Sequence, residues 1–175
     1  MIDQQFFHTY ATLFLILYVI FDLIRNRKKE RSLLKRFVFY SSIYYMIHVI
    51  KFTLFPITFI PFAVSVQLVP FYFISDSLSS GYIARAYLEN FILLLPLGLY
   101  LPLLFQRLRN LKLTIFVVFL TSTSIETIQL IKGLTIGSHR TFNVDDMILN
   151  TSGAILGYFI FKMMVVILNK LDVKM

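Results

Sequence analysis

Acidic and amide side chains interrupt two long apolar segments between residues 121 and 157. These candidate residues are Glu126, Gln129, Asp145, Asp146 and Asn150, with Arg140 in the short loop between the segments. A charged group at the middle of a bilayer costs at least ~2.5–3.5 kcal/mol, so such residues rarely face lipid. Carboxylates beside a base could supply a general base and a phosphate clamp, or could bind a polar head group. We therefore take these residues and Asn90 as ligand-binding candidates, and Glu126, Asp145 and Asp146 as catalytic candidates.

The composition of the chain is that of a membrane protein. Of its 175 residues, 58% are hydrophobic and 15% are charged, whereas a soluble domain carries roughly 25% charged residues. The net charge of +8 comes from bases in short clusters between apolar runs, a pattern typical of cytoplasmic loops and not of a nucleic-acid site. The absence of cysteine excludes disulfides and thiolate chemistry. We expect a single integral membrane domain over residues 1–175, with no cofactor and no nucleic-acid partner.

Five apolar runs have the length of a membrane helix, for which about 20 residues are needed. They cover about residues 6–24, 37–55, 88–105, 113–131 and 145–168. The sequence therefore predicts an all-α membrane protein with five transmembrane helices. The loop 25–36 holds seven bases and the loop 106–112 holds three, whereas the alternate loops hold few. Because bases concentrate in cytoplasmic loops, we expect the N-terminus outside and the C-terminus in the cytoplasm.

The apolar stretch 56–74 is a possible sixth span. Pro56, Pro61 and Pro70 divide it into pieces shorter than a span. A span here would also place the bases of the loop 106–112 outside, against the charge pattern. We therefore expect an interfacial or re-entrant segment on the outer face.

In this orientation the polar residues gather in the outer half of the membrane. Ser122, Glu126 and Gln129 share one face of the fourth helix, at spacings of i, i+4 and i+7. The other polar faces are Asp146 with Asn150 on the fifth helix, and Tyr44, His48 and Lys51 on the second. Three polar faces at one depth predict an inward-facing pocket that opens to the outer surface, near Glu89 and Asn90. Glu126 can stay charged there only beside a cation, for which we expect Arg140 first and Lys51 second.

Some of these residues also have a purely structural interpretation. Asn143 followed by Asp146 has the form of a helix start, with an N-cap and an acid that favours the helix dipole. Gly153 and Gly157 are spaced for close helix packing, and Pro96 predicts a kink in the third helix. The three histidines lack zinc spacing, and no metal site is expected.

Three blocks of the sequence resemble the signature of the VanZ-like family. They are NFILLLPLG from Asn90, SIETIQ from Ser124, and RTFNVDDMILNTSGAILGY from Arg140, and they cover about residues 85–160. The stretch Leu-Val-Pro70-Phe also resembles the Pro-Phe element of the family. The resemblance implies a small bacterial membrane protein, mostly of Gram-positive bacteria, and the name-giving member of the family confers low-level resistance to teicoplanin. The residues carried over from the family are Asn90, Glu126, Gln129, Arg140, Asp145, Asp146 and Asn150.

Two functions remain open at this stage. The preferred one is a binding protein of the bacterial plasma membrane that contributes to lipoglycopeptide resistance. Its outer pocket would hold an amphiphile, which is the drug, a membrane lipid or the head group of a cell-wall precursor. The alternative is a membrane enzyme that modifies lipid-linked cell-wall material with Glu126, Asp145, Asp146 and Arg140. A transporter is disfavoured, because the polar residues are confined to one half of the membrane and no internal repeat is evident.

Overall fold

The computed structural model describes residues 3–25, 33–57, 65–136 and 142–171. Within these residues, five helical segments are long and apolar enough to cross a membrane. They are α1 (Gln4–Arg25), α2 (Leu33–Leu54), α4 (Arg85–Leu93) continued by α5 (Leu95–Leu104), α6 (Leu111–Ile136) and α7 (Val144–Lys170). The five predicted helices of membrane-spanning length are therefore confirmed among the described residues, with boundaries within a few residues of those expected.

Four short elements lie between these helices. They are β1 (Val66–Gln67), α3 (Tyr72–Ser80), the 3-10 helix η1 (Gln106–Arg109) and β2 (Phe142–Asn143). The strands β1 and β2 pair in parallel, so that segments far apart in the sequence meet beside the start of α7. The described part of the stretch 56–74 holds only β1 and the start of α3, neither of which is long enough to cross a bilayer, while residues 58–64 lie outside the described part.

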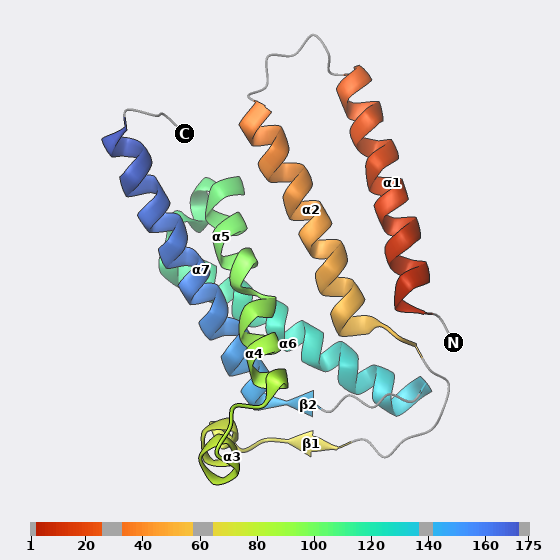
Figure 1. Cartoon of the computed structure of the whole chain (residues 1–175), viewed down its shortest axis with the longest axis vertical. Helices are drawn as coiled ribbons and strands as arrows, with labels where there is room; N and C mark the ends of the chain where they lie inside the picture. Colours follow the sequence, from red (N-terminus) through yellow and green to blue (C-terminus); the bar gives the residue numbers. More distant parts are fainter. Residues whose placement is uncertain (1–2, 26–32, 58–64, 137–141, 172–175) are drawn as a thin grey trace.

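The first turn of α1 and the last turn of α7 lie at opposite ends of the helical bundle (Figure 1). The first turn of α1 lies at the end that carries β1, β2 and α3. The last turn of α1 and the first turn of α2, which hold Arg25, Lys35 and Arg36, lie at the same end as the last turn of α7. This arrangement agrees with the charge pattern of the sequence. The orientation in the membrane stays a prediction, and we call the end with α3 the outer end on that basis.

The third span is broken at Leu94, which separates α4 from α5. Pro96 occupies the second position of α5. A backbone N–H at this position would have no partner within the helix, so proline loses no helical hydrogen bond here. Across the break, the hydroxyl of Tyr45 on α2 donates a hydrogen bond of 2.7 Å to the carbonyl oxygen of Leu93. The predicted kink is therefore confirmed. The hydrogen bond from Tyr45 joins the third span to α2 at this point.

The glycines of α5 and α7 allow the third and fifth spans to pack backbone to backbone. A Cβ atom added at Gly153 would lie 1.7 Å from the carbonyl oxygen of Phe91, and one at Gly157 would lie 1.9 Å from that of Leu95. At Gly98 the added atom would lie 1.8 Å from the carbonyl oxygen of Ala154. The predicted close packing at Gly153 and Gly157 is therefore confirmed, and α7 supports both halves of the broken span.

Candidate functional site

The polar residues of α6 and α7 face one another inside the protein. Ser122, Glu126 and Gln129 of α6 are buried, as are Asp145 and Asn150 of α7. The amide nitrogen of Asn150 donates a hydrogen bond of 3.1 Å to the hydroxyl of Ser122. These side chains therefore lie between helices and away from lipid, as their spacing predicted. We call the five residues the α6–α7 polar cluster.

Glu126 holds the start of α7 in place. Its side chain is 2% exposed, and its Oε2 atom accepts a hydrogen bond of 3.1 Å from the backbone N–H of Asn143 in β2. A buried carboxylate is stabilised by such a donor. The predicted partner Arg140 lies outside the described residues, so its pairing with Glu126 stays a prediction.

Asp145 joins three elements at the outer end. Its backbone N–H donates to the side chain of Asn143 at 2.9 Å, which confirms Asn143 as the N-cap of α7. The Oδ2 atom of Asp145 accepts a hydrogen bond of 2.8 Å from the backbone N–H of Phe73, and one of 3.5 Å from the side chain of Gln67. The carboxylate therefore lies at the N-terminal ends of both α3 and α7, where the helix dipoles favour negative charge. Asp146, which follows it, is half-buried.

Gln129 caps the end of α2. Its amide nitrogen donates a hydrogen bond of 3.1 Å to the carbonyl oxygen of Thr53, and Lys132, one turn later, donates at 2.7 Å to that of Leu54. From α1, Gln4 donates at 2.8 Å to the carbonyl oxygen of Phe55. The last carbonyls of a helix have no partner within it, so these side chains satisfy groups that the membrane would otherwise leave unpaired.

These contacts give the α6–α7 polar cluster a structural role. Glu126 and Asp145 each accept a hydrogen bond from a backbone amide, and Gln129 donates one to a backbone carbonyl. Among the residues that the structure describes, no three side chains of His, Cys, Asp or Glu are arranged as ligands of a metal ion.

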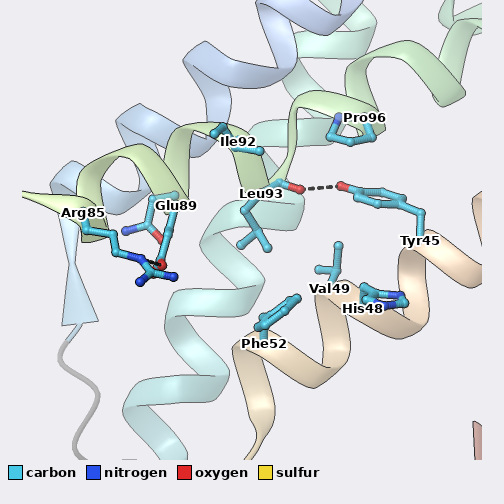
Figure 2. A pocket seen from close by; sticks show the side chains of 10 residues that line it. Tyr45, His48, Val49, Phe52, Arg85, Glu89, Ile92, Leu93 and Pro96 are labelled. Atoms are coloured by element: carbon cyan, nitrogen blue, oxygen red, sulfur yellow. Dashed lines mark hydrogen bonds and ion pairs between the residues drawn. The ribbon is translucent and has the colours of Figure 1, made fainter. Parts of the chain in front are cut away.

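A cavity of about 430 Å³ lies between α2 and the broken third span (Figure 2). We call it the α2–α4 cavity. Its outer end is polar, with Arg85, Glu89 and Asn90. Its walls are mostly apolar but include the imidazole of His48, and Tyr45 and Pro96 lie at its inner end. Of the predicted ligand residues, Asn90 therefore lines this cavity, whereas Glu126, Gln129, Asp145 and Asn150 belong to the polar cluster.

The polar end of the α2–α4 cavity carries one positive and one negative side chain. The Nε atom of Arg85 lies 2.6 Å from Oε1 of Glu89, and the two side chains are 91% and 60% exposed. The sequence placed Glu89 near the outer surface, and it offered Arg85, with Lys51 and Arg140, as a residue that could receive a phosphate or carboxylate. The i, i+4 spacing of Arg85 and Glu89 was a signal for the ion pair, because residues four apart are neighbours on a helix.

A second cavity, of about 690 Å³, lies between α3 and α4. We call it the α3–α4 cavity. Phe73 and Leu78 of α3 lie on one side, Tyr87 and Phe91 of α4 on the other, and Leu149 of α7 also contributes. Its lining contains no charged residue. The sequence did not predict this cavity, because nothing in it indicated that α3 would pack beside α4.

A family model described as VanZ/LLP1 matches residues 37–167, which is most of the chain. The match covers the three blocks noted in the sequence and extends upstream to include most of α2. No curated protein matches the chain. No solved structure matches it either.

Proposed function

The chain belongs to the VanZ/LLP1 family of membrane proteins, and from this membership and the α2–α4 cavity we propose that it contributes to resistance to teicoplanin and other lipoglycopeptides. In this proposal it lies in the plasma membrane of a bacterium. The α2–α4 cavity holds an amphiphile of the outer leaflet, which is the drug, a membrane lipid or a cell-wall precursor. The observation that carries the proposal is the combination of a charged end and an apolar body in one cavity.

The charged end suits a polar head group. The guanidinium of Arg85 can bind a phosphate or carboxylate through two parallel hydrogen bonds. Glu89 can accept hydrogen bonds from an amine, and the amide of Asn90 can pair with hydroxyl or amide groups. The ion pair between Arg85 and Glu89 is exposed to solvent, and such pairs contribute little to stability. A head group can therefore replace it at small cost.

The body of the cavity suits hydrocarbon. Leu93 of α4 points toward Val49 and Phe52 of α2 (Figure 2), and Ile92 also lines the cavity. Burial of apolar area stabilises a complex by roughly 25 cal/mol per Å². The volume of about 430 Å³ lies in the range of ligand pockets. Phe52 and Ile92 remain partly exposed at the surface of the bundle, so the hydrocarbon chain of a ligand can enter the cavity from the side.

Resistance follows from binding at the outer leaflet. If the drug itself is the ligand, the cavity keeps it from its target. If a lipid or precursor is the ligand, the protein keeps that molecule from the drug, which then lacks its site of action. Both routes depend on the same charged end, so one set of variants tests them.

The experiment compares Arg85→Gln with Arg107→Gln in a sensitive host. Both bases are exposed, but Arg107 lies in η1, outside the cavity. We expect Arg85→Gln to lose most of the protection against teicoplanin at unchanged abundance in the membrane, and Arg107→Gln to keep it. If Arg85→Gln protects as well as the parent chain, the charged end of the cavity takes no part in binding the ligand.

The enzymatic alternative depends on Glu126, Asp145, Asp146 and Arg140, of which Arg140 lies outside the described residues. Glu126 and Asp145 are nearly fully buried, and both accept a hydrogen bond from a backbone N–H. These contacts support a structural role, so we prefer the binding function.

A further inference from the structure

The helix α4 separates the two cavities. Glu89 and Leu93 line the α2–α4 cavity, and Tyr87 and Phe91 line the α3–α4 cavity. Each pair is spaced by four residues and so occupies one face of the helix. Positions two apart differ by about 200° around a helix of 3.6 residues per turn, so the pairs lie on opposite faces. The two cavities are therefore neighbours that share one wall.

An exposed ridge of α4 runs between the two cavities. Leu88 and Ile92, one turn apart, are 49% and 60% exposed. Leu88 lines the α3–α4 cavity, and Ile92 lines the α2–α4 cavity. Arg85 lies one turn before Leu88, at the N-terminal end of the ridge, and Ile83, just before it, also lines the α3–α4 cavity. Both cavities thus reach the same end of α4, where the ion pair of Arg85 and Glu89 lies.

The α3–α4 cavity has the chemistry of a hydrocarbon site. Phe73, Ile74 and Leu78 contribute aromatic and aliphatic groups from α3, and Leu149 contributes one from α7. Its lining contains no charged group that could pair with a phosphate, but it can bury an acyl chain. The nearest charge on the α3 side is Asp76, whose carboxylate accepts a hydrogen bond of 2.9 Å from the hydroxyl of Tyr87. A phosphate needs a cation, so it must lie at Arg85, which is the nearest base in the sequence.

We propose that the ligand of this site is a diacyl phospholipid whose head group carries a phosphate and a primary ammonium. The phosphate pairs with Arg85 and the ammonium with Glu89. One acyl chain lies in the α2–α4 cavity and the other in the α3–α4 cavity, on either side of the ridge of Leu88 and Ile92. The inference rests on the proposed function, because the α2–α4 cavity is the same site, and it selects the membrane lipid among the ligands of that proposal.

Two properties of the site favour this ligand over one with a single chain. The lone chain of a lipoglycopeptide, or of a polyprenyl precursor, would fill one cavity and leave the other without an occupant. The charged end presents one cation and one anion 2.6 Å apart, which complements a zwitterionic head group better than an anionic one.

The first experiment measures lipid binding to the purified full-length protein. The probes are dioleoylphosphatidylethanolamine and its single-chain lyso form, competing with a fluorescent lipid in detergent. Leu88→Trp fills the α3–α4 cavity and Ile92→Trp fills the α2–α4 cavity. The matched controls are Leu120→Trp and Ile128→Trp, which replace similarly exposed residues of α6.

We expect the parent chain to bind the diacyl lipid at least tenfold more tightly than the lyso form. Leu88→Trp should reduce the affinity for the diacyl lipid to that for the lyso form, without changing the latter. Ile92→Trp should weaken both, and the controls should change neither. If Leu88→Trp binds the diacyl lipid like the parent while Ile92→Trp does not, the ligand has one chain in the site and only the present inference fails. If Ile92→Trp also binds both lipids like the parent, the proposed function fails with it.

A second experiment uses the parent chain alone, so that no variant has to fold. A phosphatidylethanolamine with a diazirine at the end of either acyl chain is crosslinked to the protein by light. We expect labelled peptides from both α2 and α3. Labelling of α2 without α3 would overturn the inference, and an excess of phosphatidylglycerol that removes both labels would overturn the choice of a zwitterionic head group.

Discussion

Gly153→Ala should separate α7 from α4, because the new methyl group has no space. The added Cβ atom would lie 1.7 Å from the carbonyl oxygen of Phe91, and ordinary contact begins at 3.4 Å. The obstacle is backbone, which cannot rotate away as a side chain can, so the distance must grow by about 1.7 Å before contact is ordinary. Overpacking of a core typically costs about 1–3 kcal/mol, and a clash with backbone belongs at the upper end of that range.

The assay for Gly153→Ala is thermal unfolding of the purified protein in detergent. For a chain of this size, a loss of about 3 kcal/mol lowers the midpoint by roughly 6–12 °C. Ser152→Ala, one residue earlier in α7 and only half-buried, is the control and should change the midpoint little. Because Phe91 also lines the α3–α4 cavity, we expect Gly153→Ala to reduce lipid binding as well. A midpoint equal to that of the parent chain would refute the backbone contact between α7 and α4.

Three further predictions follow from the polar contacts and the charge pattern. Glu126→Ala leaves the partly buried backbone N–H of Asn143 without its acceptor and should cost about 1–3 kcal/mol in denaturant unfolding, whereas Glu126→Gln keeps an acceptor oxygen and should lose less. Asp145→Ala removes the acceptor of the Phe73 N–H, so amide hydrogen exchange in α3 should become faster while exchange in α6 stays unchanged. A cysteine at Ser79 should react with an impermeant thiol reagent applied to whole cells, and one at Arg109 should not. Labelling of Arg109→Cys would show that the predicted orientation in the membrane is wrong.

The parts of the fold that were predictable rest on local signals. The five spans follow from the length of the apolar runs, and the break near Pro96 follows from the missing N–H of proline. The close packing at Gly153 and the N-cap at Asn143 follow from residue types with one dominant structural use. The burial of Glu126 follows from the cost of exposing a charge to lipid.

The parts that were not predictable depend on contacts between distant segments. The carboxylate of Asp145 accepts from the N–H of Phe73, 72 residues away, and no spacing in the sequence indicates that contact. The α2–α4 cavity arises because Tyr45 reaches the broken third span at Leu93, which fixes how α2 lies against α4. Spacing within one helix gives the face on which a residue lies but not the helix that the face meets. For this reason the predicted ligand residues, which were expected in one pocket, are divided in the structure between the α6–α7 polar cluster and the α2–α4 cavity.

The central claim is that an amphiphile occupies the α2–α4 cavity, and a tryptophan placed there tests it most directly. The chain contains no tryptophan, so Phe52→Trp creates a single fluorophore in the cavity and Phe116→Trp creates one on the exposed surface of α6. Both variants are titrated with a phosphatidylethanolamine brominated in its acyl chains, whose bromine atoms quench tryptophan on contact. The account predicts that Phe52→Trp is quenched saturably at low mole fraction and that Arg85→Gln abolishes this phase, while Phe116→Trp is quenched in proportion to mole fraction. Proportional quenching of both variants, unchanged by Arg85→Gln, would contradict it.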